Sequence, residues 1–263
     1  MSYIDKIPLE ALFVITIVVV LIAIEAGYRF ARFLKARTKD DQEAPVATMV
    51  QATLSLVAFM IAFTFGVAAQ RFNERRVLII QEASSISSTF SCAELLPEAN
   101  KNEVQNCLRK YLDLRVKEQP YSKNGPVMIA ESEKLQKLPS SQAVEVSKAN
   151  INSGVISSFL SSLNETMSFQ SKRVAAGLYA RIPEHIWTAL YLIILLGMAA
   201  AGYQTGKTGS KSITVNLILT FSFAIVMTLI ADLDHPSIGF VEATRMPLID
   251  LQRKIGCPAA DIK

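Results

Sequence analysis

The sequence predicts an all-α polytopic membrane protein, and three observations support this. Apolar residues make up 51% of the chain and charged residues 19%, with a mean hydropathy of +0.30. The apolar residues gather in four blocks of about 20 residues, the length that a helix needs to cross a hydrocarbon core of about 30 Å. Between the blocks, apolar side chains recur at helical spacing without an alternating strand pattern.

The four blocks define the expected domain organisation. They cover about Leu9–Tyr28, Val46–Ala69, Ile186–Tyr203 and Ile213–Ala231. We therefore expect transmembrane helices 1 and 2 in residues 1–69, a helical extramembrane domain in 70–183, and transmembrane helices 3 and 4 in 184–233. Residues 234–263 form a C-terminal segment that is expected to pack on the extramembrane domain.

The long insert is predicted to continue the second helix past the membrane until Pro97 breaks the apolar spacing. Asn100 or Asn102 is the expected cap of the next helix. One stripe of that helix is predicted to be buried, comprising Val104, Leu108, Tyr111, Leu112 and Arg115. Two further helices, over 127–137 and 143–181, would complete a bundle.

The distribution of cations predicts which side of the membrane the insert occupies, because short cytoplasmic loops are rich in Lys and Arg. The connection after the first helix and the one between the third and fourth helices carry Arg29, Arg32, Lys35, Arg37, Lys39, Lys207 and Lys211. This places residues 70–183 outside the cytoplasm. Cations at the other membrane face oppose that assignment, namely Arg71, Arg75, Arg76, Lys172, Arg173 and Arg181.

Cys92 and Cys107 lie on opposite arms of the hairpin that Pro97 creates. Antiparallel helices would bring them close, so they are candidates for a disulfide in an oxidising compartment. Free buried cysteine is equally compatible with the sequence, because cysteine is a common small core residue.

Two residues near the membrane boundaries have simple interpretations. Glu25 lies in the first apolar block four residues before Arg29, so the two side chains can form an ion pair at the interface. Trp187 begins the third membrane helix and is interpreted as an interfacial anchor.

The fourth membrane helix runs into "LIADLDHPSIGF", residues 229–240. Asp232, Asp234 and His235 are residue types of a metal or catalytic site, and His185 is the other histidine of the chain. However, Asp232 and Asp234 do not share a helix face, and a proline disfavours helix at the residue before it. We therefore interpret the segment as a structural hinge that ends the helix and joins it to the insert through polar contacts. The hinge comprises Asp232, Asp234, His235, Pro236 and Gly239.

The second membrane helix carries the sharpest pattern in the sequence. Small or polar residues follow steps of three and four and so share one helix face. That face comprises Thr48, Gln51, Ser55, Ala58, Ala62, Gly66 and Ala69. Small residues allow helices to pack closely in lipid. The same stripe around a symmetry axis would line a narrow pore, with Phe59 and Phe63 near its constriction. The sequence leaves both alternatives open.

Several function classes lack support. The net charge of +4 is small and no Lys/Arg run is interleaved with aromatic residues, so nucleic acid is not an expected partner. The chain has no P-loop, no G-x-G-x-x-G and no Ser/His/Asp order. We therefore expect no catalytic residues, no cofactor and no metal, and do not expect an enzyme.

Four segments resemble a known family. "AQRFNERR" follows the second helix, "LLPEANKNEVQNCLRKYLDLRVKE" follows in the insert, "PEHIW" begins the third helix and "LDHPSIGFVEATRMPLIDL" follows the fourth. Together they resemble the bacterial bestrophin-like membrane family of unknown function over about residues 10–252. Asp234, Pro236 and Gly239 match its Leu-Asp-Arg-Pro-Phe-x-Gly hallmark, and His235 stands in place of the arginine.

The resemblance implies a relation to bestrophins, which are pentameric anion channels with a pore-lining second helix. It therefore implies an oligomeric ion channel in a bacterial inner membrane, whose partners are lipid, further copies of the chain and small inorganic ions. Bestrophins hold their insert in the cytoplasm, which conflicts with the cation count. The alternative is a non-conducting sensor or assembly protein whose helical domain binds a partner or ligand. A third is an enzyme that uses His185, Asp232, Asp234 and His235.

Overall fold

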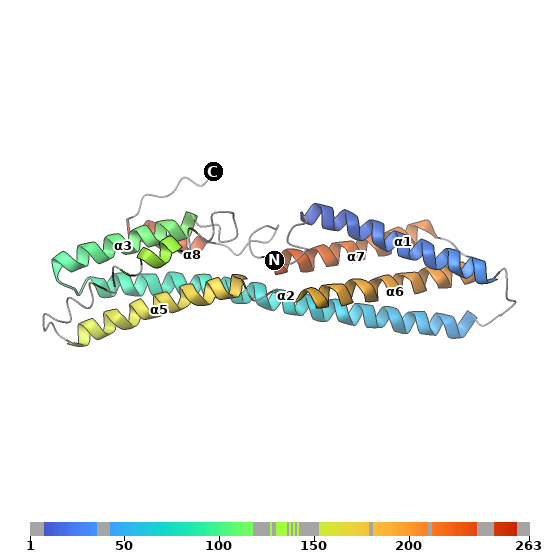
Figure 1. Cartoon of the computed structure of the whole chain (residues 1–263), viewed down its shortest axis with the longest axis horizontal. Helices are drawn as coiled ribbons and strands as arrows, with labels where there is room; N and C mark the ends of the chain where they lie inside the picture. Colours follow the sequence, from blue (N-terminus) through green and yellow to red (C-terminus); the bar gives the residue numbers. More distant parts are fainter. Residues whose placement is uncertain are drawn as a thin grey trace. The chain divides into compact units, whose positions relative to one another are not determined.

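Figure 1 shows the computed structural model of the chain. The structure describes residues 8–35, 43–117, 127, 130–135, 137, 139, 141, 153–178, 181–209, 212–235 and 245–256. Every element in these ranges is a helix, and four helices are long and apolar enough to cross a membrane, which confirms the predicted fold class. The chain divides into two compact units. Unit 1 comprises Met1–Gln70 and Arg181–Val241, and unit 2 comprises Arg71–Ala180 and Glu242–Lys263.

The membrane-length helices are α1 (Leu9–Lys35), α2 (Glu43–Ala93), α6 (Glu184–Thr208) and α7 (Ile213–Asp234). Helix α1 extends seven residues beyond its predicted limit at Tyr28. Helix α6 begins after Pro183 and ends at Gly209, whose φ of 76° stops the helix in a conformation that suits glycine. Helix α2 continues without interruption from unit 1 into unit 2, as its apolar spacing predicts.

Helices α1 and α6 run parallel and touch through their backbones. Thr16 lies 3.0 Å from the Tyr191 hydroxyl near one end, and Lys35 Nζ donates to the Lys207 carbonyl at 2.8 Å at the other. Between these points, a Cβ on Gly202 would overlap the Ile24 carbonyl oxygen. A Cβ on Gly27 would overlap the Ala199 carbonyl oxygen in the same way, and one on Gly206 would come within 2.7 Å of the Tyr28 carbonyl oxygen. Small residues therefore set the distance between the two helices.

The interior of unit 1 includes the only tryptophan of the chain. Trp187 is 3% exposed, and its ring stacks on that of Tyr191 with centroids 6.4 Å apart. The interpretation of Trp187 as an interfacial anchor is therefore wrong. The indole lies on the inward face of α6 together with Leu190 and Ile194, both of which are buried.

Unit 2 contains the second part of α2 together with α3 (Glu98–Lys117), α5 (Ser153–Leu178) and α8 (Met246–Lys254). The predicted stripe of α3 is buried throughout, as expected. Helix α3 starts at Glu98, so the prediction of a cap at Asn100 or Asn102 is wrong. The Pro97 carbonyl instead accepts from the Lys101 amide at 2.8 Å and begins the helical bonding pattern one turn earlier.

Helix α8 belongs to the C-terminal segment and packs on α3. Leu248 and Leu251 join a buried cluster that contains Tyr111 and Leu112 of α3. The Gln252 amide donates to Asp113 at 2.8 Å, which fixes the register of the two helices. The predicted start of α5 at residue 143 falls outside the described residues, and the described helix begins at Ser153.

The candidate disulfide is not formed in the structure, where Cys92 and Cys107 are free thiols. The two side chains take part in different contacts. Cys92 packs beside a cluster that contains Ala93 and Leu96, whereas the Cys107 thiol donates to the Leu135 carbonyl at 2.9 Å. Cys257 lies outside the described residues.

The contact between α1 and α6 gives a matched pair of glycine substitutions. We expect Gly202→Ala to destabilise the protein by about 1–3 kcal/mol, because the new methyl group overpacks the backbone of α1. Gly66→Ala is the control, since a Cβ there would meet nothing within 4 Å, and we expect its stability to be unchanged or up to about 1 kcal/mol higher. Thermal unfolding in detergent, followed by circular dichroism, measures both. Equal melting temperatures for Gly202→Ala and wild type would contradict the close contact.

Candidate functional site: an exposed face of helix α2

The membrane segment of α2 has three distinct faces, separated by roughly 120° around the helix. The first face packs inside unit 1 and comprises Val50, Val57, Ile61, Thr64 and Ala68, all buried. On this face Val57 lies against Gly197 of α6, where a Cβ would be 2.8 Å from a Val57 methyl carbon. The buried face therefore fixes the rotation of α2 about its own axis, and with it the direction of the other two faces.

The second face is the small and polar stripe that the sequence singled out. Its last residue, Ala69, is partly buried, and all the others are exposed in the single chain, namely Thr48, Gln51, Ser55, Ala58, Ala62 and Gly66. Close packing within the chain therefore does not account for these small residues. Gly66 shows this most directly, because a Cβ added there would meet no atom of another helix in the described part of the chain within 4 Å.

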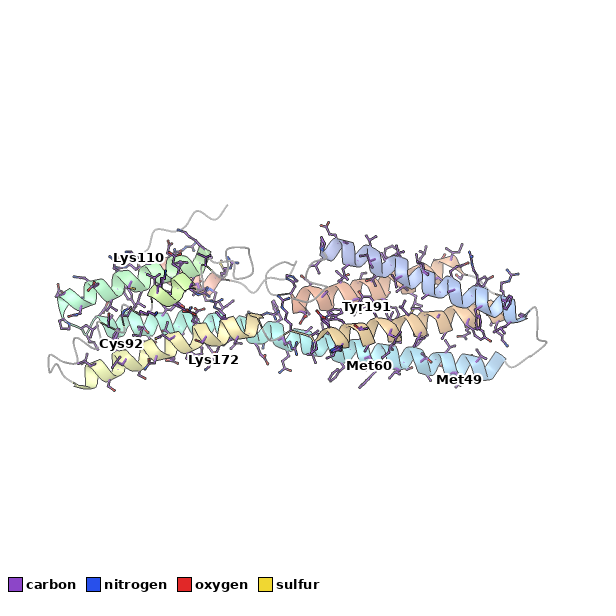
Figure 2. All side chains as sticks on the ribbon, in the orientation of Figure 1. Met49, Met60, Cys92, Lys110, Lys172 and Tyr191 are labelled. Carbon is purple, nitrogen blue, oxygen red and sulfur yellow. The ribbon has the colours of Figure 1, made fainter. Side chains whose placement is uncertain are left out.

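The third face carries bulky apolar side chains. Met49, Leu56 and Phe63 are exposed on it, and Met49 and Met60 mark the course of this part of α2 in Figure 2. Phe59 lies between the second and third faces and is 66% exposed, while Phe63 is 62% exposed. The two aromatic rings that were predicted near a constriction therefore border the small and polar stripe and are largely exposed in the single chain.

Hydroxyl groups in this segment are satisfied by the helix itself. Ser55 donates to the Gln51 carbonyl at 2.9 Å, and Thr64 donates to the Met60 carbonyl at 2.8 Å. Each therefore needs no partner from another helix to satisfy its donor, and its oxygen can still accept a hydrogen bond. Gln51 differs from them, because its side-chain amide has two donors and a carbonyl that are costly to leave in hydrocarbon.

The hinge segment is described only in part, since Pro236 and Gly239 lie outside the described residues. Helix α7 ends at Asp234 with His235 as its cap, where the sequence places the helix end. Asp234 Oδ1 accepts from the Ile182 amide at 3.0 Å and so ties the end of α7 to the residue before Pro183, where α6 begins. Whether the segment also joins the insert stays a prediction.

The residues considered for a metal or catalytic site have different surroundings. Asp232 and Asp234 are buried, whereas His185 is exposed and His235 partly exposed. Within the described ranges, no group of three or more His, Cys, Asp or Glu side chains is arranged to hold a metal. The buried carboxylate of Asp234 instead stabilises a backbone amide, which is a structural role.

The predicted ion pair between Glu25 and Arg29 is present, with Arg29 Nε 2.9 Å from Glu25 Oε1. Because α1 continues to Lys35, the pair lies inside the helix rather than at its end. The Arg29 side chain is largely exposed, and that of Glu25 is partly exposed.

Unit 2 contains a buried ionic cluster that was not predicted from the sequence. The Glu82 side chain is 0% exposed and accepts two bonds from Arg115, at 2.8 and 2.9 Å. The Tyr111 hydroxyl lies 2.8 Å from Glu82 Oε1, and Arg173 Nε lies 3.2 Å from Glu82 Oε2. The cluster joins α2, α3 and α5. The residue that could have indicated this cluster from the sequence is Arg115, because it lies on the predicted buried stripe. A fully buried arginine needs a carboxylate partner.

The protonation states of the cluster follow from its burial. Burial and the adjacent Glu82 carboxylate raise the pKa of the Tyr111 hydroxyl well above its usual range. Tyr111 therefore stays protonated and can donate a hydrogen bond. Burial lowers the pKa of Arg115, but the charge of Glu82 and its hydrogen bonds outweigh that effect and raise it. Arg115 accordingly stays charged, and we expect the cluster to keep its charges rather than to gain or lose protons.

The arrangement of helices defines the class of protein. Four membrane-length helices, with a helical unit inserted between the second and the third, make this a polytopic helical membrane protein. A solved crystal structure of a membrane protein is similar over 97% of this chain and 98% of that chain, with a TM-score of 0.62 and 15% sequence identity. At that identity the similarity concerns the fold alone. No curated protein matches the chain.

The family follows from the sequence match. The bestrophin-like domain matches residues 17–248, which is most of the chain and includes α2, α6, α7 and α1 from residue 17 onward. The chain therefore belongs to the bestrophin-like family, as the four quoted segments suggested.

The buried ionic cluster generates a prediction about unit 2. We expect Glu82→Gln to destabilise it by about 3–5 kcal/mol, because the substitution leaves Arg115 buried without its anion. Buried Cys107 can report on the opening of unit 2 in a Cys92→Ser, Cys257→Ser background. Its alkylation rate should rise roughly 100-fold or more, since labelling follows the population of the open form.

The control for this experiment is Glu94→Gln, which removes an exposed carboxylate that follows α2 in the same unit. We expect it to change the stability by less than about 0.5 kcal/mol. If the Cys107 alkylation rate were the same in Glu82→Gln and Glu94→Gln, the ionic cluster would have no special role in holding unit 2 together.

Proposed function

We propose that the protein is a subunit of an oligomeric ion channel of the bacterial inner membrane, and that the exposed stripe of α2 lines its pore. The observation that carries the proposal is the exposure of the stripe from Thr48 to Gly66, on a helix that buries a different face inside unit 1. We propose no catalytic step for this protein.

The chemistry of the stripe limits what can lie against it. Hydrocarbon is a poor neighbour for Gln51, because the amide would lose its hydrogen bonds with water. Bulky apolar side chains, which suit lipid, are on the third face instead. The stripe is therefore suited to water, or to close approach by another copy of α2. In a ring of copies around a common axis, the stripe would face water on the axis and would also lie close to the neighbouring copy of α2.

The two phenylalanines give the proposed pore its constriction. Phe59 and Phe63 border the stripe and project from the chain, so a ring of copies would surround the axis with aromatic side chains. A hydrophobic constriction of this kind can control conduction by excluding water. The small residues on either side of that ring would leave the conduit wide enough for ions.

Ion flux from proteoliposomes tests the pore assignment. We expect Ser55→Leu to abolish flux, because a bulky apolar side chain would occupy the conduit, while the protein remains folded. Ser222→Leu is the matched control, since Ser222 is also exposed on a membrane helix and donates to its own helix at 2.8 Å, but lies on α7.

Comparing the two variants distinguishes flux lost because the pore is blocked from flux lost because of any added leucine in a membrane helix. Flux that survives Ser55→Leu would contradict the assignment of α2 as the pore. Loss of flux in both variants would make the result a consequence of misfolding or misassembly. A well-folded monomer or dimer without flux would instead support a non-conducting sensor or assembly protein, because one or two stripes cannot enclose a pore.

We propose that residues 70–183 lie outside the cytoplasm, based on the cations in the short connections. Lys172→Cys in α5 and Thr208→Cys at the end of α6 give exposed thiols in the insert and in a short connection, in a cysteine-free background. In intact cells, a membrane-impermeant maleimide should label the first thiol and spare the second. The reverse pattern would place the insert in the cytoplasm.

A further inference from the structure

The end of α1 beyond Tyr28 combines positive charge with exposed aromatic rings. Arg29, Arg32 and Lys35 are exposed on its last two turns. Phe30 and Phe33 alternate with them and are 58% and 55% exposed. Water is a poor surrounding for an exposed apolar ring, and hydrocarbon is a poor surrounding for a cation. The boundary between headgroups and acyl chains suits both groups.

Helix α6 brings a fourth cation to the same place. Lys35 Nζ donates to the Lys207 carbonyl at 2.8 Å, so the last turns of α1 and α6 lie together at one end of unit 1. The Arg32 guanidinium lies 5.9 Å from the centre of the Tyr28 ring, which holds it close to the helix. We call this group, comprising Arg29, Arg32, Lys35 and Lys207, the α1–α6 cationic surface.

Few carboxylates neutralise this surface. Glu25 pairs with Arg29 at 2.9 Å and lies one turn nearer the middle of α1. The four cations and this carboxylate leave a formal charge of +3. The connecting residues 36–43 and 210–211 together contain three cations and three carboxylates, so they add no net charge. This end of unit 1 is therefore strongly positive where the membrane helices end.

From this arrangement we infer that the α1–α6 cationic surface binds the headgroup of an anionic phospholipid. The guanidinium and ammonium groups complement the phosphate of the headgroup. Phe30 and Phe33 lie where they can contact the acyl chains, a contact that a free phosphate ion could not make. The combination selects a lipid over a soluble anion, and it does not depend on ion conduction by α2.

Native mass spectrometry of the full chain in detergent tests the inference. The protein is titrated with dioleoyl phosphatidylglycerol or with dioleoyl phosphatidylcholine, and the two affinities are compared. Each cation near an anionic membrane surface strengthens binding about fivefold, so we expect the anionic lipid to bind at least about tenfold more tightly. In a triple variant, Arg29→Gln with Arg32→Gln and Lys35→Gln, this preference should disappear.

The control removes the same amount of charge elsewhere. Lys134→Gln, Lys172→Gln and Lys254→Gln alter three exposed lysines of unit 2 and should leave the preference unchanged. The inference is overturned if wild type binds both lipids equally or if the control loses the preference to the same degree. Displacement of the lipid by excess inorganic phosphate would identify a soluble anion as the partner and would also overturn it.

A single substitution keeps the test decisive if the triple variant does not fold. Arg32→Gln alone should reduce the preference about fivefold, and Arg32→Lys should retain most of it because the charge remains. A wild-type preference in Arg32→Gln would contradict the assignment.

Discussion

The architecture of unit 1 depends on the backbone contact between α1 and α6. Gly27, Gly202 and Gly206 let the two helices approach until side-chain atoms have no room between them. In lipid, such contacts replace the hydrophobic effect as the main force between helices, because the bilayer offers no gain from apolar burial alone. The α1–α6 pair fixes the face of α6 that carries Gly197, and Val57 of α2 packs against that glycine. The orientation of α2 is thus set indirectly by glycines on other helices.

This dependence explains why α2 leaves two of its faces uncovered. A helix that is held on one side exposes everything else, and in α2 the exposed part is divided into a small, polar face and a bulky, apolar face. Spanning lipid alone does not require the two kinds of side chain to lie on separate faces. In unit 2 the same helix is also held by buried charges, those of Glu82, Arg115 and Arg173, beside an apolar cluster that includes Ala83 and Ile86. The first half of α2 is therefore positioned by close contact with a glycine of another membrane helix. Its second half is held in a core that contains buried ion pairs.

The sequence predicted the fold well because apolar block length and helical spacing are local signals. The four membrane helices, the uninterrupted second helix and the buried stripe on α3 follow from such signals. The Glu82 cluster could not be predicted in the same way, since its members are 33 and 91 residues apart and meet only after three helices have packed. Trp187 was misjudged because its position along α6 suggested an interface, whereas its burial depends on which face of α6 meets α1. The stripe on α2 was visible in the sequence, but its exposure depended on the packing of a different face.

The burial of Trp187 has a spectroscopic consequence. It is the only tryptophan of the chain, so the intrinsic indole emission of the protein comes from a single position inside unit 1. An indole in apolar surroundings emits at shorter wavelength than one in water and is shielded from aqueous quenchers. The emission spectrum of the intact protein therefore reports the state of the α1–α6 contact region without any label, while unit 2 contributes no tryptophan signal.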